Sequence, residues 1–318
     1  MAKTGILLVN LGTPDAPTVP AVRRYLAEFL SDPRVVEQPR WLWALILHGI
    51  ILRFRPRKSA KAYQKIWTER GSPLLLHSRE LAERLEQALP QDMIVTLGMR
   101  YGRPELVKAL AELSAAKVEK IIVLPLYPQY SATTTATTLD AIARQLMTWR
   151  DIPSLSFVRS YYDLPEYIEG LAAHIRQFWQ EHGMADKLLL SFHGLPQRYV
   201  DKGDPYYQEC MATASQLAQL LKLSAQQWQV VFQSRLGVEK WLQPYLDHTL
   251  RSLPSAGVKS VQVICPGFAV DCLETLEEVA QMNRELFLHA GGEKYQYIPA
   301  LNSSDAQIRI LTALINIK

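Results

Sequence analysis

Two short segments carry the residues best suited to chemistry, Ser-Phe-His-Gly-Leu-Pro at 191–196 and Asp-Cys-Leu-Glu-Thr-Leu-Glu-Glu at 271–278. Each follows an apolar run that predicts a β-strand, Leu188–Leu190 before the first and Val261–Ile264 before the second. In an open α/β sheet, ligands bind outside the carboxyl ends of the strands, where these turns would lie. A histidine from one turn and a carboxylate from the other can hold a divalent first-row metal or move protons near neutral pH.

His193 supports two interpretations. Beside Gly194 and Pro196, its ring could be satisfied by a local hydrogen bond and have no further role. Alternatively, it presents a neutral imidazole to a ligand, and imidazole as a side-chain type, with a reference pKa of about 6.5, suits proton transfer near neutral pH.

The acidic segment is equally open. Asp271 and Glu274 match a capping box, with Asp271 as N-cap of a helix. In an α-helix, however, Asp271, Glu274 and Glu278 share one face, and Glu277 points elsewhere. A cap accounts for two acids, whereas a stripe of three could relay protons or a hydrated cation at the cost of mutual repulsion.

Size and composition exclude several classes of protein. The 318 residues, 48% of them hydrophobic, can bury a large core, and the net charge of +4 gives little reason to expect nucleic acid as a partner. Thr4–Asn10 reads as a first strand rather than a signal peptide, and the longest apolar run, Trp41–Leu52, is too short to span a bilayer. We therefore expect a cytoplasmic protein. Its three cysteines form no CxxC pair, which disfavours an iron–sulfur cluster.

The chain reads as two copies of one plan. A strand and a Gly-x-Pro loop open each copy, at Ile6–Pro14 and Lys187–Pro196, and a helix follows, at Leu75–Leu89 and Tyr207–Leu221. Nearly continuous apolar strands alternating with helices predict parallel sheets covered on both faces. We expect two similar doubly wound, Rossmann-like α/β domains, 1–150 and 151–318, with their sheets facing a central cleft. The last helix, about 305–317, could pack back on the first domain.

The first copy carries an insertion at about 30–70. Gly12 and Arg100 are 88 positions apart, but Gly194 and Arg235 only 41. The insertion includes an apolar, aromatic stretch followed by Arg53, Arg55, Arg57 and Lys58, which together form residues 41–58. This pattern is typical of a helix that rests on an anionic membrane or takes up a flat apolar ligand. An ordinary core helix with a solvated basic end is the alternative.

Several familiar motifs do not occur. Neither G-x-G-x-x-G nor a P-loop is present, which disfavours a nucleotide-binding Rossmann enzyme, and no G-x-S-x-G elbow indicates a hydrolase. The Thr-rich segment 130–137 could bind an anion or simply begin a helix.

Taken in order, the motifs resemble the ferrochelatase family, and its proteobacterial branch most. The resemblance implies insertion of Fe(II) into protoporphyrin IX to form protohaem, the last step of haem biosynthesis. It covers nearly the whole chain and rests on Val9-Asn-Leu-Gly-Thr-Pro14, Phe29-Leu-Ser-Asp-Pro33, Gly71-Ser-Pro73, Leu124-Pro-Leu-Tyr-Pro-Gln-Tyr130, Ser191-Phe-His-Gly-Leu-Pro196, Gly203-Asp-Pro-Tyr206, Phe232-Gln-Ser-Arg235, Trp241-Leu-x-Pro244 and Cys272-Leu-Glu-Thr-Leu276.

The resemblance assigns roles to single residues. It makes His193 the proton acceptor or metal ligand, Glu274 its partner carboxylate, and Asp271 and Glu278 an acidic path. Residues expected to line the porphyrin are Leu11, Tyr63, Arg100, Tyr101 and Trp241. No cofactor is expected, because Fe(II) is a substrate, and the 41–58 lip can make peripheral contact with the inner membrane.

Two departures from the family pattern bear on these roles. Leu11 stands where the coproporphyrin-using branch carries tyrosine, which favours protoporphyrin, and Cys272 stands where the family often has histidine. Three alternatives stay open: a chelatase for another tetrapyrrole or metal, a porphyrin carrier without turnover, and an NAD-linked oxidoreductase.

Overall fold

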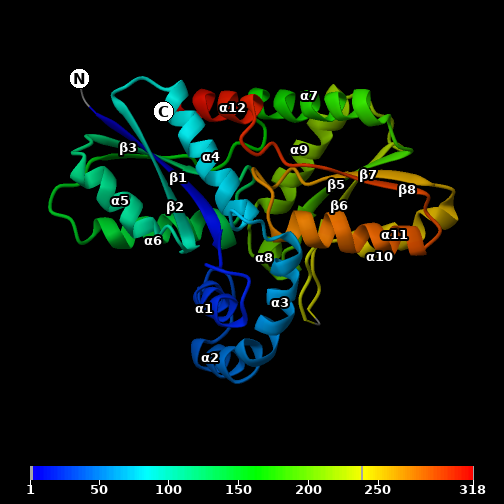
Figure 1. Cartoon of the computed structure of the whole chain (residues 1–318), viewed down its shortest axis with the longest axis horizontal. Helices are drawn as coiled ribbons and strands as arrows, with labels where there is room; N and C mark the ends of the chain where they lie inside the picture. The colour runs from blue at the N-terminus through cyan, green and yellow to red at the C-terminus, as the bar shows by residue number, and fades with distance from the viewer. Residues whose placement is uncertain (1–2, 238, 318) are drawn as a thin grey trace. The chain divides into compact units, whose positions relative to one another are not determined.

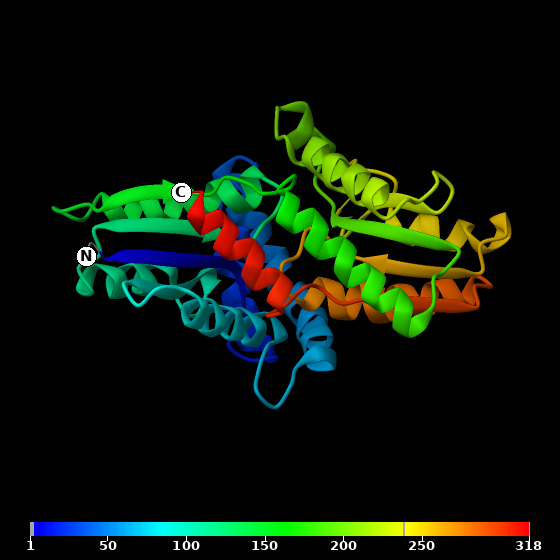
Figure 2. The ribbon, with the colours of Figure 1, turned by 90° about the horizontal axis from the view of Figure 1, so that it is seen from above.

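Two four-stranded parallel sheets organise the chain, with strand orders β2-β1-β3-β4 and β6-β5-β7-β8 (Figures 1 and 2). They are seen in a computed structural model that describes residues 3–237 and 239–317. The α/β class and the two parallel sheets confirm the fold expected from the sequence.

The elements of the first sheet and its helices lie in the first half of the chain. They are β1 (Thr4–Thr13), α1 (Val19–Leu30), α2 (Arg40–Ile46), η1 (Leu47–Ile51), α3 (Leu52–Ile66), α4 (Pro73–Ala88), β2 (Met93–Gly102), α5 (Leu106–Ala115), β3 (Lys120–Pro125), η2 (Ala132–Ala136), α6 (Thr137–Leu146) and β4 (Ser154–Phe157).

The elements of the second sheet follow. They are α7 (Pro165–His182), β5 (Lys187–His193), α8 (Gln197–Asp201), α9 (Tyr206–Leu220), β6 (Trp228–Gln233), α10 (Leu246–Ser252), η3 (Pro254–Ala256), β7 (Ser260–Ile264), η4 (Glu274–Met282), α11 (Asn283–His289), β8 (Lys294–Ile298) and α12 (Asp305–Asn316).

By its internal contacts the chain divides into two compact units. The first comprises the residues up to Tyr127, Ser131–Ser160 and those from Leu311 onward, and the second comprises Pro128–Tyr130 and Tyr161–Ile310. Because β4 pairs with β3, the first sheet continues past residue 150, where the sequence placed the domain junction.

In the first unit, successive side chains of each strand point to opposite faces of the sheet. Leu7 and Val9 of β1 point to the face where α5 and α6 supply Leu110 and Ile142 to an apolar core. Asn10 points to the other face, where its amide donates to Ser78 Oγ of α4 over 3.1 Å. Helices therefore cover both faces of the sheet, as its continuous apolar strands require.

The second unit repeats this arrangement. Leu189 of β5 faces a core that includes Leu250 of α10, Val279 of η4 and Phe287 of α11. On the opposite face, the indole of Trp179 in α7 donates to Gln262 of β7 over 2.8 Å. In Figure 1, α10 and α11 lie on one side of the sheet and α7 and α9 on the other.

The repeat extends to the strand ends. The amide of Met99 donates to Pro104 O over 2.7 Å, and the amide of Phe232 donates to Pro244 O over 2.8 Å. Asn10 pairs with Met99 and Phe192 with Phe232, so Leu11 and His193 hold the same position in the two sheets.

Both opening strands extend into the segments that were expected to be loops. β1 continues to Thr13 and β5 to His193, so His193 is the last residue of its strand and not part of a turn. The Thr-rich segment begins a helix, as one of the two interpretations expects, because Ser131 Oγ accepts the amide of Thr133 over 3.1 Å and caps η2.

The insertion, at about 30–70, forms α2, η1 and α3 of the first unit. None of the seven residues of α2 is buried, whereas α3 buries Leu52, Ala60 and Tyr63. Among the described residues, none of the helices has the length and apolar character needed to cross a bilayer.

Gly12, where β1 lies against β2, can be compared with Gly71, which lies in an open loop. Both have positive φ, +113° at Gly12 and +118° at Gly71, but a Cβ on Gly12 would lie 1.7 Å from Tyr101 O while one on Gly71 would meet nothing within 4 Å. We expect Gly71→Ala to cost only backbone strain, roughly 1–2 kcal/mol, and Gly12→Ala to cost more because it also forces β1 from β2. Urea unfolding of both variants measures this, and equal losses would contradict it.

Candidate functional site

His193 lies at the carboxyl end of β5, on the face of the second sheet that η4 covers. Its position follows from strand alternation, because Leu189 and His193 are four residues apart and point to the same side. The ring is partly exposed. Its Nδ1 lies 2.7 Å from Gly194 O, and since a carbonyl only accepts, Nδ1 carries the hydrogen in the neutral ring. Nε2 then keeps its lone pair for a proton or a metal.

The backbone that orients the imidazole is itself fixed. The amide of Gly194 donates to Gln233 O over 2.7 Å. A Cβ on Gly194 would lie 2.8 Å from that oxygen and 3.2 Å from the Trp241 ring, so only glycine fits. The indole of Trp241 donates to Leu236 O over 2.8 Å. Trp241 therefore packs directly against the residue next to His193.

Glu274 and Glu278 lie on η4, which is a π-helix rather than the expected α-helix. Its bonds run from i to i+5, as from the amide of Asn283 to Glu278 O, and residues four or five apart then share a face. Glu274 and Glu278 are four apart, so they stay together. The three-acid stripe, which assumed α-helical spacing, is wrong for Asp271.

Asp271 precedes η4 and is buried, at 3% exposure. Its carboxylate accepts from Tyr297, Thr275 and Asn302 side chains rather than from the amides of the first helical turn. The capping-box prediction is therefore also wrong: Leu273 is the N-cap residue, and its side chain makes no capping bond.

Glu278 is held by both donors of one residue. The Ser234 amide donates to Glu278 Oε1 over 2.8 Å and the Ser234 hydroxyl donates to Oε2. Burial raises the pKa of Glu278 above its ordinary value, against the opposing effects of the Ser234 hydrogen bonds and the His193 charge. The charge on Glu274 adds to the rise. Because His193 and Glu274 both act on the pKa of Glu278, the three side chains lie in one electrostatic environment.

Cys272 contributes no thiolate to this site. It is buried, and burial, reinforced by the charge on Glu274, raises the pKa of its thiol well above the ordinary value. A protonated thiol is a poor metal ligand. Within residues 3–237 and 239–317, no group of three or more His, Cys, Asp and Glu side chains could hold a metal ion.

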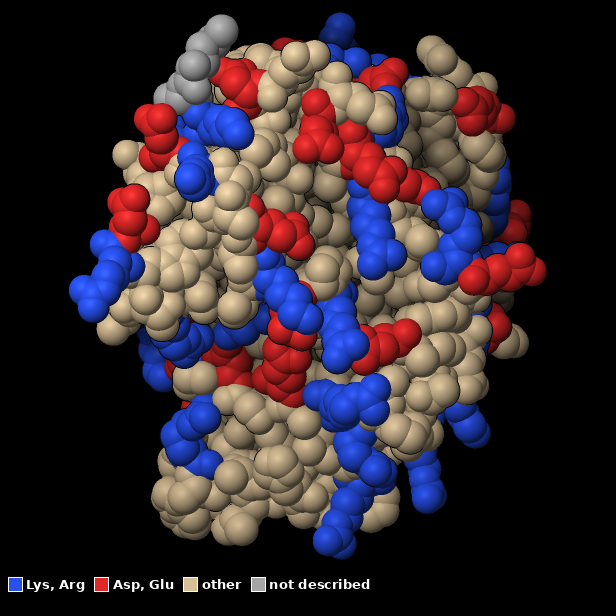
Figure 3. Space-filling model, turned by 60° about the vertical axis from the view of Figure 1, so that its left-hand side comes forward, with Lys and Arg blue, Asp and Glu red and all other residues tan. Residues whose placement is uncertain are grey.

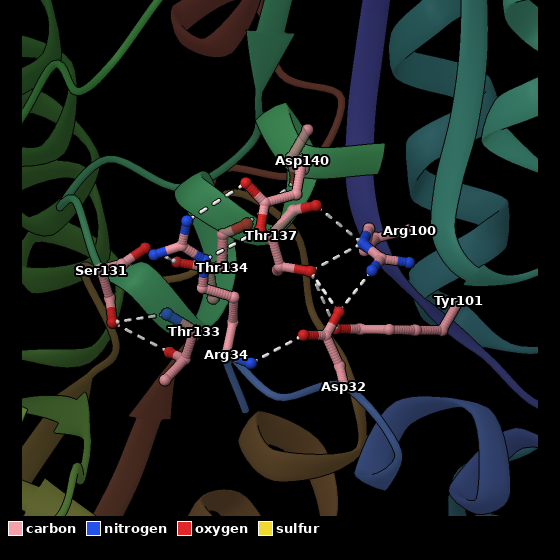
Figure 4. Close-up of polar contacts among 10 residues, drawn as sticks. Asp32, Arg34, Arg100, Tyr101, Ser131, Thr133, Thr134, Thr137 and Asp140 are labelled. Atoms are coloured by element: carbon pink, nitrogen blue, oxygen red, sulfur yellow. Dashed lines mark hydrogen bonds and ion pairs between the residues drawn. The ribbon is translucent and has the colours of Figure 1, made fainter. Parts of the chain in front are cut away.

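In the first unit, two of the residues expected to line the porphyrin, Arg100 and Tyr101, belong to a buried polar cluster (Figure 4). The Arg100 guanidinium bonds to Asp32 and to Thr137 Oγ1, the latter over 2.8 Å, and the Tyr101 hydroxyl donates to Asp32 over 3.0 Å. Arg34 adds its amide, 2.8 Å from Asp32 Oδ1. Both the cation of Arg100 and the phenol of Tyr101 are therefore already engaged within the unit.

Asp32 is the centre of this cluster. Burial acts to raise the pKa of its carboxyl, but hydrogen bonds from Thr137 and Arg34, the Arg100 charge and the Tyr101 hydroxyl outweigh it and lower that pKa. Of the remaining predicted residues of this unit, Leu11 is half-buried, and Tyr63 is buried with its ring edge-on to Trp67 at 6.0 Å between centroids.

Sequence reasoning did not select Asp32 and Ser234, whose side chains hydrogen-bond to residues of the candidate site. Both lie inside motifs it had singled out, 29–33 and 232–235. Their polar side chains at the ends of apolar segments were the available signal.

Solved structures of chelatases and of a chelatase-like protein share this fold. SirB from Bacillus subtilis, solved with Fe3+, matches with a TM-score of 0.60 at 10% identity, over 99% of this chain and 94% of SirB. A multi-domain protein of Deinococcus radiodurans, described as structurally similar to chelatases, matches with a TM-score of 0.51 at 14% identity, over 99% of this chain and 55% of its own.

Sequence comparison identifies the family. The ferrochelatase family model matches residues 3–318. The ferrochelatase of Methylococcus capsulatus is 57% identical over 314 residues, 99% of this chain and 96% of the relative, and that of Nitrosococcus oceani is 55% identical over 318 residues, 99% and 86%. The chain belongs to the ferrochelatase family. It is a metal-inserting chelatase, a lyase of haem biosynthesis.

The raised pKa of Glu278 has a consequence for stability. A carboxyl whose pKa is higher in the folded than in the unfolded chain loses its favourable contribution as the pH rises through the folded value. Glu278→Gln should therefore raise the melting temperature at pH 7.5, and the gain should shrink as the pH falls toward the ordinary value of 4.5. Thermal melts across this range test it, with the exposed acid of α11 changed in Glu285→Gln as control. A gain that grows on acidification would contradict the assignment.

Proposed function

We propose that this chain inserts Fe(II) into protoporphyrin IX to form protohaem, with His193 as proton acceptor or metal ligand and Glu274 as its partner carboxylate. The single observation that best supports these roles is the tautomer of His193. Its Nδ1 hydrogen is committed to Gly194 O, which leaves Nε2 as the basic atom. No resident cofactor takes part, because the iron is a substrate.

Metal insertion releases protons from the porphyrin, and it therefore requires bases at the candidate site. As one Fe(II) enters the porphyrin, two pyrrole N–H protons leave. Nε2 of His193 accepts the two protons one after the other, and Glu274 and Glu278, in the same electrostatic environment, pass each of them on to solvent. Imidazole and carboxylate also suit Fe(II) without holding it as thiolates would, so that the metal can be passed on.

Of the five residues expected to line the porphyrin, Leu11, Tyr63, Arg100 and Trp241 are proposed to contact it, and Tyr101 to act through Arg100. Trp241 offers an indole against Gly194, close to His193. Tyr101 is only 1% exposed and bonds to Asp32, so its contribution is to hold the cluster of Arg100 in place. An apolar Leu11 at the position equivalent to His193 supports protoporphyrin over the more acidic coproporphyrin.

The two central roles are tested by substitution. His193→Ala and Glu274→Gln should each lower kcat for anaerobic Fe(II) insertion by about 100-fold or more, as expected for loss of a general base. Porphyrin affinity, followed by fluorescence, should stay within a few-fold because neither change removes apolar contact area. Insertion at the parental rate by either variant would refute its role.

Substrate choice separates this proposal from its rivals. The parent protein should prefer protoporphyrin IX to coproporphyrin III. Cobalt insertion into sirohydrochlorin without activity on protoporphyrin would indicate a different chelatase, and porphyrin binding without any insertion would indicate a carrier.

We also propose a cytoplasmic location with peripheral contact to the inner membrane through the 41–58 lip. Trp41, Leu45 and Phe54 are exposed by 70%, 66% and 72%. Arg53 and Arg57 are exposed beside them. Largely uncharged surface bordered by Lys and Arg at the lower end of Figure 3 includes this region. Exposed aromatics flanked by cations are typical of segments that bind the surface of anionic bilayers.

Vesicle binding tests the lip. Trp41→Ser/Phe54→Ser should weaken co-sedimentation with anionic phospholipid vesicles by about tenfold, because two large apolar side chains are lost. The matched control is Met147→Ser/Ile152→Ser, which removes exposed apolar residues elsewhere in the same unit, at 83% and 53% exposure. Equal binding by both double variants would exclude the lip as the membrane contact.

A further inference from the structure

We propose that Tyr297 and Asn302 are positioning residues for metal insertion. Through Asp271 they fix the segment that leads into η4, and so the place of the Glu274 carboxylate. The inference rests on the role proposed above for Glu274. It also gives Asp271 a different task from the acidic path suggested by the resemblance.

Asp271 is held from two sides. Tyr297 donates its hydroxyl to Oδ1 over 2.6 Å, and Asn302 donates its side-chain amide to Oδ2 over 2.8 Å. The backbone amide of Asp271 donates in turn to Asn302 Oδ1 over 2.8 Å. Asn302 therefore hydrogen-bonds to both the main chain and the side chain of Asp271. A carboxylate with both oxygens occupied is suited to fixing the chain rather than passing protons.

The segment held in this way has no other regular support. Residues 266–272 belong to no strand or helix, so no ladder of backbone hydrogen bonds places them. Asp271 connects them to Tyr297 of β8 and to the loop that follows it. Asn302 adds a backbone bond from its own amide to Ala269 O over 3.0 Å.

The connection reaches the neighbour of Glu274. Thr275 donates its hydroxyl to Asp271 Oδ1 over 2.9 Å and accepts the Cys272 amide over 3.0 Å. Thr275 is fully buried and adjacent to Glu274 in the chain. A shift of Asp271 would therefore move the first turn of η4, on which Glu274 stands.

The residue type at 302 agrees with this task. Asn302 has φ +51°, in the left-handed region that asparagine tolerates better than most residues. Glycine could keep that backbone conformation but would lose the amide. Asn302→Gly therefore removes the side-chain hydrogen bonds to Asp271 while keeping the backbone conformation.

Two variants and one matched control form the test. Tyr297→Phe and Asn302→Gly should each lower kcat for Fe(II) insertion by fivefold or more, with KM for protoporphyrin within twofold of the parent. The control, Lys222→Gly, changes an exposed left-handed residue of the same unit, φ +57°, that makes no contact with Asp271 or η4 in the hydrogen bonds described above. It should keep kcat within twofold. Test variants that match the control would overturn the proposal.

Coupling and exchange measurements separate this proposal from the one it rests on. If Tyr297 acts through Glu274, Tyr297→Phe should add no further loss to Glu274→Gln, whereas multiplying losses would refute the route. Amide hydrogen exchange at 272–278 should quicken in both test variants but not in Lys222→Gly, and unchanged exchange would refute the positioning. Quickened exchange together with normal turnover by Glu274→Gln would leave the anchor standing and remove the proposed role of Glu274.

Discussion

The alternation of side chains along β5 is the constraint on which the site depends. β5 lies between β6 and β7, and its pairing of His193 with Gln233 sets which side chains face η4. A shift of one residue in this register would turn His193 to the face covered by α7 and α9, away from both glutamates. The apolar residues of the strand oppose such a shift because each face of the sheet is packed, so core packing and the direction of the imidazole are specified together.

Much of this frame was predictable from the sequence, because apolar strands alternating with helices leave a strong periodic signal. The contacts within the site were less predictable. Helix η4 is of π type, and the Tyr295 hydroxyl of β8 donates to its backbone, over 2.6 Å to Val279 O. Such a tertiary bond leaves no periodic trace in the sequence. Asp271 lies before the helix begins, so α-helical spacing placed it wrongly. Asp32 escaped notice for a related reason, since its partners Arg100 and Thr137 lie 68 and 105 residues away.

The two copies of the fold have used equivalent positions differently. At the end of the central strand, Leu11 stands in the first sheet and His193 in the second. The first copy instead carries an insertion that forms α2, η1 and α3, and its buried Asp32–Arg100 pair anchors the start of that insertion to the end of β2. The side chains proposed to carry out the chemistry lie in the second copy, whereas the first copy carries an additional exposed surface.

The π-helical form of η4 carries a consequence for how this segment can change. A π-helix fits more residues into each turn than an α-helix does, so deletion of one residue within 280–282 would let the backbone return to ordinary i to i+4 bonding. That deletion would leave Val279 in the core but change the position of the next core residue, Phe287 of α11, relative to Glu274. The extra residue of the π-helix therefore sets the position of the acids relative to the rest of the helix. Insertion or loss of a residue in this segment should consequently be less well tolerated than substitution.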